Sequence, residues 1–327
     1  MENTLQKVLQ EYGFNPANST LSKTGTGLIN HTFLLSANEK KYIVQEINVA
    51  VFTSPELIDE NIAAIGSYLK KNFPAYIFTM PVQSISGKTQ IEVDNHFFRL
   101  FDYVPGSTTY TVVHEPGIAF EAAKQFGRFT KLLKGFPANS LQETIPDFHN
   151  LSLRQCQYEQ ALQTASAERL EIAKELIAEI AGFKWITESY KKNIQHQAFK
   201  KRVTHHDTKI SNVLFDKNHK GICVIDLDTI MPGYFLSDVG DMMRTYLSPA
   251  GEEERDFDKI EVRDDYFYAI ADGYLSEMQE ELSDAEIGAF YFSGQLMIYM
   301  QALRFLADFL NGDIYYSMGW IYNEQKE

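Results

Sequence analysis

The sequence predicts an α+β protein with a small β-rich lobe followed by a larger, mostly helical lobe. The first hundred residues contain short runs of alternating hydrophobic and polar residues, the pattern of half-buried β-strands. After the Pro105–Gly106 pair, longer segments carry hydrophobic residues at helical spacing. We therefore expect residues 1–104 and 105–327 to form two lobes, and a cleft between two lobes is a common place for a small-molecule site.

The first lobe is predicted from four segments. Residues 23–37, KTGTGLINHTFLLSA, place two glycines between short extended runs. Residues 40–48, KKYIVQEIN, alternate, which puts Ile43, Gln45 and Ile47 on one face of a strand. Residues 56–73 carry hydrophobic residues at helical spacing, and HFFRLFDYV in residues 96–104 is a further strand that ends at the Pro-Gly break.

The second lobe is predicted to be helical apart from one hairpin. Residues 117–136 and 167–180 each carry one apolar helical face. The hairpin consists of NVLF, the turn DKNHKG and ICVIDLD, in residues 212–228. Residues 287–303 carry no charge, but they fall short of the ~20 apolar residues of a membrane span, so we expect a core helix.

The charge balance restricts the partners of the protein. With 30 Lys and Arg against 44 Asp and Glu, the net charge is −14, which argues against a nucleic-acid or membrane surface. The two cysteines form neither a metal-ligand spacing nor a disulfide framework. The polar first residues do not resemble a signal peptide, so we expect a cytoplasmic protein, as a monomer or small homo-oligomer.

One motif carries the chemistry. In HHDTKISNVLF, residues 205–215, Asp207 and Asn212 lie on a loop that enters the hairpin, and Asp226 lies at the hairpin's exit. Antiparallel pairing brings entry and exit together, so Asn212 and Asp226 are expected to face a common point. A carboxylate and an amide oxygen suit Mg²⁺. Asp207 then has no metal to hold and can accept a proton from an attacking hydroxyl.

This order of residues is that of a kinase-type phosphoryl-transfer site. The alternative is a solvated turn in which the Asp and Asn side chains only cap backbone groups. Asp228 follows Asp226 by two residues, so on an extended strand both point to the same side, and Asp228 can reach a second metal ion or the first ion's water shell. Its alternative role is a hydrogen bond to nearby backbone.

The sequence resembles the aminoglycoside phosphotransferase and choline kinase superfamily of small-molecule kinases. HHDTKISNVLFD, VIDLDTIMPG and SDVGDMMR carry the resemblance, and together with TGTGLINHTFLL, YIVQEIN, IPDFHN and ALRFLADFLNGDIYY they are similar to its N-acetylhexosamine 1-kinase branch. The resemblance runs, with gaps, over residues 25–316. It implies a bilobal protein-kinase-like fold and transfer of the ATP γ-phosphate to the anomeric hydroxyl of a sugar, with Mg²⁺.

The resemblance also implies roles for single residues. Asp207 is the catalytic base or orients the hydroxyl, and Asn212 and Asp226 are metal ligands. Supporting residues, nucleotide contacts and sugar contacts follow from the same motifs. His205, Asp238 and Asp241 brace the catalytic loop; Gly25 and Gly27 belong to the loop over the nucleotide phosphates; residues 102–104, from Asp102 to Val104, receive the adenine through backbone groups; and His31, Arg304 and Tyr315 contact the sugar.

Packing alternatives exist for two of the sugar contacts. His31 is also compatible with packing at the end of a strand, and Arg304 with an ion pair to Asp308, four residues later.

The sequence departs from the kinase pattern at one position. Kinases place a lysine on the third strand to pair with the α- and β-phosphates, and this register has Gln45, which carries no charge. Lys41 shares its face but lies about 13 Å away along a strand. We therefore expect nucleotide binding to depend on Mg²⁺ and backbone donors, and a lysine partner on the helix, such as Glu60, is in doubt.

Two other functions remain open at this stage. The chain can be a kinase of an amino alcohol or an aminoglycoside, against which Arg304 in the acceptor pocket speaks. It can also be a catalytically inactive nucleotide-binding protein, which the missing lysine suggests and the complete set of Asp207, Asn212 and Asp226 opposes.

Overall fold

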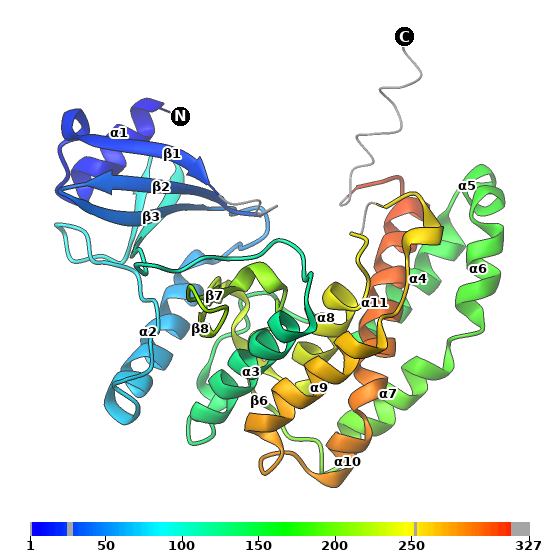
Figure 1. Cartoon of the computed structure of the whole chain (residues 1–327). Coiled ribbons are helices and arrows are strands. Elements are labelled where there is room, and N and C mark those ends of the chain that lie inside the picture. The colour runs from blue at the N-terminus through cyan, green and yellow to red at the C-terminus, as the bar shows by residue number, and fades with distance from the viewer. Residues whose placement is uncertain (1, 25–28, 252–253, 315–327) are drawn as a thin grey trace.

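The computed structural model describes residues 2–24, 29–251 and 254–314 of the chain. It confirms the predicted α+β class, because a β-sheet forms one lobe and a larger group of helices forms the other (Figure 1). The chain passes from the sheet to the helices after residue 102, and the Pro105–Gly106 pair lies in this connection.

The first lobe is built on a five-stranded antiparallel sheet with the strand order β1-β2-β3-β5-β4. Its strands are β1 (Ser19–Thr24), β2 (His31–Ala37), β3 (Lys40–Ile47), β4 (Gln90–Val93) and β5 (His96–Asp102). Alternation gives the sheet two different faces. Leu35, Val44 and Leu100 form a core with helix α1 (Glu2–Glu11), which covers the outer face in Figure 1. Gln45 lies on the opposite face, toward the second lobe.

Helix α2 (Pro55–Asn72) connects β3 to β4, but its apolar side packs with the second lobe. Ile58, Ile62, Ile65 and Leu69 are buried in the same hydrophobic core as the helices of that lobe. Asn61 on the same helix donates a hydrogen bond to the backbone oxygen of Ile230 over 2.9 Å. Helix α2 precedes residue 104 but belongs to the core of the second lobe, so the two hydrophobic cores do not separate at residue 104. The division into domains at residue 104 stays a prediction.

The second lobe is a bundle of helices with two short two-stranded sheets. Helix α3 packs on α9, and α11 packs on both α8 and α4. The helices are α3 (Pro116–Leu132), α4 (Leu151–Thr164), α5 (Ala167–Ile172), α6 (Lys174–Ala181), α7 (Trp185–Gln195), α8 (Phe235–Tyr246), α9 (Asp264–Met278), α10 (Asp284–Gly288) and α11 (Phe290–Leu310). Gly240 allows α8 and α11 to approach closely, because a Cβ there would overlap the backbone oxygen of Ser293.

Two short two-stranded sheets, of which β7–β8 is a hairpin, carry the predicted motif. Strand β6 (Arg202–Thr204) pairs with β9 (Met231–Gly233), and β7 (Val213–Phe215) pairs with β8 (Gly221–Val224), all antiparallel. The loop between β6 and β7 contains residues 205–212, and the loop between β8 and β9 contains Asp226 and Asp228. The β7–β8 hairpin lies below the sheet, at the side of the second lobe that faces the first (Figure 1).

One local prediction differs from the structure. Residues 167–180 form two helices, α5 and α6, which meet at Ala173, and Leu176 of the predicted apolar face is 56% exposed. The core helix predicted for residues 287–303 is confirmed from Phe290 onward, because α11 has many buried residues and packs on α8, whereas residues 287 and 288 end α10. In the described ranges, no helix combines the length and the hydropathy that a membrane span requires.

Candidate active site

Asp238 on α8 shapes the loop that contains Asp207. Its buried carboxylate accepts hydrogen bonds from the backbone N–H groups of His205, over 3.1 Å, and His206, over 2.8 Å. His206 has a φ angle of 66°, in the left-handed region that residues other than glycine rarely adopt. Burial raises the pKa of Asp238 to about 6, against the effect of these donors and of His205. The two hydrogen bonds therefore hold an unfavourable backbone conformation directly before Asp207.

Gly233 on β9 makes room for this loop. A Cβ at this position would overlap the side chains of Thr204 and His206. The hydroxyl of Thr204 in turn contacts Nε2 of His206 over 2.8 Å. The loop can therefore lie against β9 only because residue 233 is glycine.

Asp207 is connected to Asn212 and Lys209. Its Oδ2 accepts a hydrogen bond from Nδ2 of Asn212 over 2.9 Å and forms an ion pair with Nζ of Lys209 at 2.8 Å. The same Asn212 nitrogen also donates to the backbone oxygen of Asp207. The Asp207 side chain is 24% exposed, so an incoming hydroxyl can reach it. Because Asn212 directs its NH₂ group at Asp207, its Oδ1 is the atom that remains for a cation.

Asp226 follows the second strand of the β7–β8 hairpin. The N–H of Ile225 donates to the backbone oxygen of Asn212 over 2.9 Å, so Asp226 directly follows the residue that pairs with Asn212. Burial, and then the nearby Asp228, raise the pKa of Asp226 to about 7, although Lys209 acts in the opposite direction. A buried carboxylate with too little positive charge around it favours a bound cation.

The prediction that an extended strand continues through Asp228 is wrong. Strand β8 ends at Val224, Asp226 has a left-handed backbone with φ 60° and ψ 64°, and Leu227–Thr229 form a 3₁₀ turn. Asp226 and Asp228 therefore do not alternate along one strand. The side chain of Asp228 is 2% exposed and is engaged by two side chains of the first lobe, Arg99 and Asn30.

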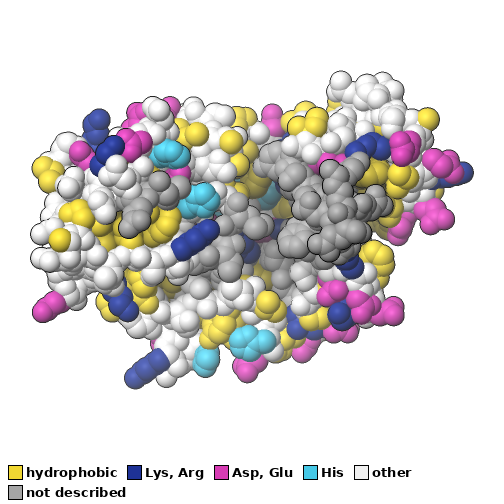
Figure 2. Space-filling view, turned by 90° about the horizontal axis from the view of Figure 1, so that it is seen from above, with side chains coloured by type: hydrophobic (Ala, Val, Ile, Leu, Met, Phe, Trp, Pro, Cys, Tyr) yellow, Lys and Arg dark blue, Asp and Glu magenta, His cyan; other side chains and the backbone are white. Residues whose placement is uncertain are grey.

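The cleft between the lobes has a volume of about 1020 Å³. Gln45 and Arg99 line it from the sheet, and Asn212 and Asp226 line it from the second lobe. Asp102 and Val104, predicted at the adenine end, line it as well. In the view from above, acidic side chains lie mostly toward the rim of this face (Figure 2).

Comparison with protein families decides the class of enzyme. The family model described as the phosphotransferase enzyme family, APH, matches residues 20–269, well over half of the chain. The chain belongs to this family. The predicted superfamily and the predicted class of enzyme, a phosphotransferase, are thereby confirmed.

Solved structures show that this phosphotransferase has the kinase-like fold of the family. Spectinomycin phosphotransferase APH(9)-Ia, in its complex with AMP, has a TM-score of 0.61 at 13% identity, over 99% of this chain and 95% of that one. Ethanolamine kinase from Plasmodium vivax also has a TM-score of 0.61, at 15% identity, over 96% and 85%. A microcompartment-associated aminopropanol kinase has a TM-score of 0.56 at 16% identity, over 98% of both chains. At these identities the likeness concerns the fold alone.

His205 and Asp241 contact the catalytic loop of the phosphotransferase from within. Nε2 of His205 lies 2.9 Å from the backbone oxygen of Ile225, and its ring packs edge-on against Phe126. Asp241 accepts the N–H of Thr208 over 2.7 Å and pairs with Arg244 at 2.8 Å. These contacts join the loop of residues 205–212 to Ile225, to α3 and to α8; the bracing function stays a prediction.

The predicted sugar contacts do not all lie together. His31 shares the outer face of the sheet with the α1 core, and its Nδ1 contacts Glu46 over 3.0 Å. Gln45 and Thr32, one residue along on each strand, line the cleft instead. Arg304 lies on α11 above the ring of Phe148 and donates to Gln301. Gly25, Gly27 and Tyr315 lie outside the described residues.

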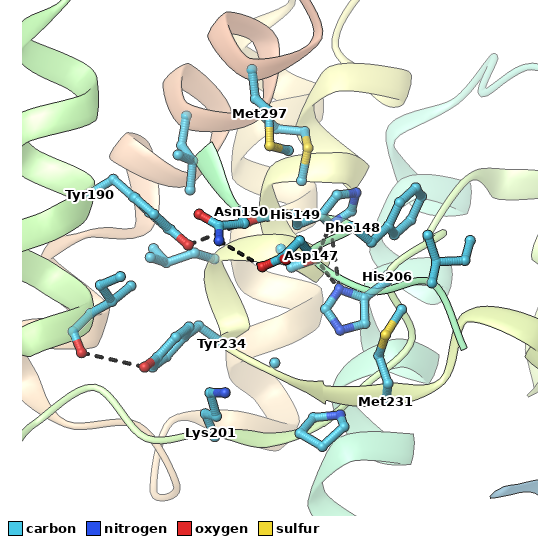
Figure 3. A pocket seen from close by; sticks show the side chains of 18 of the residues that line it. Asp147, Phe148, His149, Asn150, Tyr190, Lys201, His206, Met231, Tyr234 and Met297 are labelled. Atoms are coloured by element: carbon cyan, nitrogen blue, oxygen red, sulfur yellow. Dashed lines mark hydrogen bonds between the residues drawn. The ribbon is translucent and has the colours of Figure 1, made fainter. Parts of the chain in front are cut away.

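A second, smaller pocket of about 250 Å³ lies behind Phe148 and His149, within the second lobe (Figure 3). Ser237 Oγ contacts Nδ1 of both His149 and His206, and Asn150 donates to Asp147 over 2.7 Å. Burial lowers the pKa of both histidines, that of His206 to about 3, so both rings are neutral at pH 7. These polar side chains satisfy one another, and they connect the IPDFHN segment to the loop before Asp207.

Two residues of the site, Lys209 and Arg99, have no role that was predicted from the sequence. Lys209 lies in the motif HHDTKISNVLF, two residues after Asp207, and this short spacing could have indicated a contact between the two side chains. Burial opposes its charge, but Asp207 and Asp226 outweigh burial and raise its pKa, so Lys209 is charged at neutral pH. Arg99 lies in the strand segment HFFRLFDYV, where a lone arginine among apolar residues was the only signal.

Proposed function

We propose that this phosphotransferase is an ATP- and Mg²⁺-dependent kinase that transfers the γ-phosphate to a sugar hydroxyl, the anomeric hydroxyl of an N-acetylhexosamine. The observation that carries the proposal is the arrangement of Asp207, Asn212 and Asp226 beside a cleft that holds a nucleotide-sized volume. The family match supports phosphoryl transfer, and the neighbour bound to AMP supports nucleotide binding in this fold.

The side-chain oxygen atoms of Asn212 and Asp226 are suitable ligands for Mg²⁺. Asn212 Oδ1 and the Asp226 carboxylate would hold it, which agrees with the one or two protein carboxylates that Mg²⁺ sites commonly use beside substrate phosphates. In the described ranges, no cluster of three or more His, Cys, Asp or Glu residues could hold a metal ion. When bound, the ion neutralises phosphate charge.

The protein's own groups then position the acceptor. Asp207, whose side chain is 24% exposed, orients the attacking hydroxyl and takes the proton from it. Lys209 forms an ion pair with Asp207 Oδ2 at 2.8 Å and places a positive charge beside the transferred phosphate. Asn212 fixes Asp207 from the other side over 2.9 Å. Catalysis in this arrangement comes from positioning and charge.

The arginines near the predicted acceptor region suit an acceptor that is rich in oxygen atoms. After burial and His206, the charges of Arg304, Arg244 and Arg154 contribute to lowering the pKa of His149, so these three side chains lie near its ring. Arg244 is also paired with Asp241. Hydroxyl and N-acetyl oxygens of a sugar accept hydrogen bonds from arginine.

Phosphorus NMR after incubation with MgATP tests the proposal. We expect an acid-labile, alkali-stable sugar monophosphate with an N-acetylhexosamine, and no product with Asp207→Asn. A panel with ethanolamine, aminopropanol and spectinomycin tests the second candidate, a kinase of aminated acceptors, which the names of the structural neighbours suggest. Turnover of only these compounds would refute the proposal of a sugar acceptor. If calorimetry shows no binding of MgATP, the hypothesis of a catalytically inactive protein is favoured.

A further inference from the structure

We propose that Arg99 provides the positive charge of the nucleotide-phosphate site, one strand away from the position where kinases carry a lysine. The inference rests on the proposed function, because it concerns the same nucleotide. It assigns a role to a buried residue of β5, and it explains how Gln45 can occupy the lysine position.

The sheet places Arg99 directly beside Gln45. The two residues face each other in the register of β3 and β5, and both line the cleft. Nε and NH2 of Arg99 donate to Oε1 of Gln45 over 3.2 and 3.0 Å. The guanidinium also lies 5.2 Å from the ring centre of Phe101 on the same strand. Gln45 thus acts as the acceptor that orients the arginine.

Arg99 is bound on its other side to the second lobe. Its NH2 lies 2.5 Å from Oδ1 of Asp228, and both side chains are almost fully buried, at 1% and 2% exposure. Asp228 also accepts a hydrogen bond from Asn30, over 2.8 Å. Asn30 lies directly before β2, close in sequence to the predicted phosphate loop, and its Oδ1 accepts the N–H of Asn48. The guanidinium is therefore held where the sheet meets the loop of Asp226.

One hydrogen-bonding group of Arg99 remains unused. Among the described residues, NH1 has no hydrogen-bond partner although it is buried. A buried guanidinium nitrogen without an acceptor is unfavourable, and native structures pair such groups with protein, water or a ligand. A phosphate oxygen in the cleft is the matching acceptor, because arginine binds phosphate through its fork of donors.

The same geometry explains the absence of a lysine at position 45. A lysine there would place a second positive charge directly opposite Arg99 on the neighbouring strand, which is destabilising. Glutamine supplies a carbonyl oxygen instead. The positive charge of the kinase site is thus displaced from β3 to β5, and Gln45 and Arg99 form a complementary pair.

Calorimetric titration with MgADP, and separately with adenosine, tests this assignment on four proteins. They are the wild type, Arg99→Gln, Gln45→Lys and the exchanged double variant Gln45→Lys/Arg99→Gln. Thermal unfolding is measured on each. We expect Arg99→Gln to bind MgADP at least about tenfold more weakly, the loss of one charge-assisted phosphate contact, with adenosine affinity unchanged. The double variant should recover most of the MgADP affinity, and Gln45→Lys alone should unfold at lower temperature.

Several outcomes decide against the assignment. Unchanged MgADP affinity in Arg99→Gln overturns it, and so does an equal loss for MgADP and adenosine, which would indicate a purely structural connection between the lobes. If Arg99→Gln does not fold, because Asp228 is left without its partner, the double variant decides. MgADP affinity near that of the wild type supports the assignment, and a loss above about tenfold with adenosine binding intact overturns it. A wild type that binds no MgADP refutes the proposed function instead.

Discussion

Replacing Asp238 by asparagine tests how the catalytic loop is held. The carboxylate accepts one backbone N–H on each oxygen, from His205 and His206. Asparagine keeps the shape but has only one acceptor oxygen, so its NH₂ group must face one of the two N–H donors. A hydrogen bond to a charged group contributes about 1.5–3 kcal/mol to stability. The buried N–H that loses its acceptor cannot bond to water instead, so this contribution is not recovered. We therefore expect a destabilisation of about 2–3 kcal/mol.

This free energy corresponds to a measurable shift of the melting temperature. At an unfolding entropy of about 2.1 cal/mol/K per residue, the 327-residue chain has about 0.7 kcal/mol/K if it unfolds as one unit. A loss of 2–3 kcal/mol then lowers the melting temperature by about 3–4 °C. We expect a clear loss of turnover beside this modest loss of stability. His206, whose φ angle is 66°, is no longer held by the Asp238 carboxylate, and the position of the adjacent Asp207 changes with it.

Asp216→Asn is the matched control. Asp216 also accepts two backbone N–H groups, from Asn218 and Lys220, but in the turn of the β7–β8 hairpin, far less buried than Asp238. Water can replace these contacts, so the melting temperature should change by less than about 2 °C and turnover should be unchanged. Calorimetric scans and steady-state kinetics on both variants are the assay. Equal effects of the two substitutions, or a fully active Asp238→Asn protein, would refute the reasoning.

Three further predictions concern the same loop. Lys209→Met should reduce kcat by about tenfold to a thousandfold, because the positive charge beside Asp207 is lost. The melting temperature should change little, because the Lys209 side chain is 36% exposed. An unchanged kcat would contradict the catalytic role of Lys209. Gly233→Ala should destabilise the protein by about 1–3 kcal/mol in chemical denaturation, because the added methyl group overlaps Thr204 and His206, and an unchanged midpoint would exclude this close contact. The unfolded chain binds protons on histidine below pH ~6.5, while native His206, with a pKa of about 3, does not, so the stability of the wild type rises with pH in this window. Relative to His206→Asn, the wild type should therefore lose about 1.4 kcal/mol per unit as the pH falls from 6 to 4, and parallel stability curves would show that the ring is not held neutral.

Much of the site could be predicted from short segments of sequence. Asp207 and Asn212 are five residues apart, and their hydrogen bond is formed within one loop. The hairpin that follows is local as well, so its pairing brings Asp226 to Asn212 without help from the rest of the chain. For the same reason the strands and helices, and with them the α+β class, could be expected from periodicity, since each pattern lies within a single element.

The partners of Arg99 and Asp228 were decided only by the tertiary structure. Gln45 and Arg99 are 54 residues apart, and they meet because β5 pairs with β3 in the sheet order β1-β2-β3-β5-β4. Asp228 meets them across the two lobes, after a left-handed turn at Asp226 that ends the extended strand expected from the sequence. No local pattern encodes a contact between strands and lobes that are distant in sequence. The sequence by itself determined the local elements and which polar groups share one loop and hairpin. The packing of the lobes decided which buried charges face one another, because burial makes an unpaired charge unfavourable.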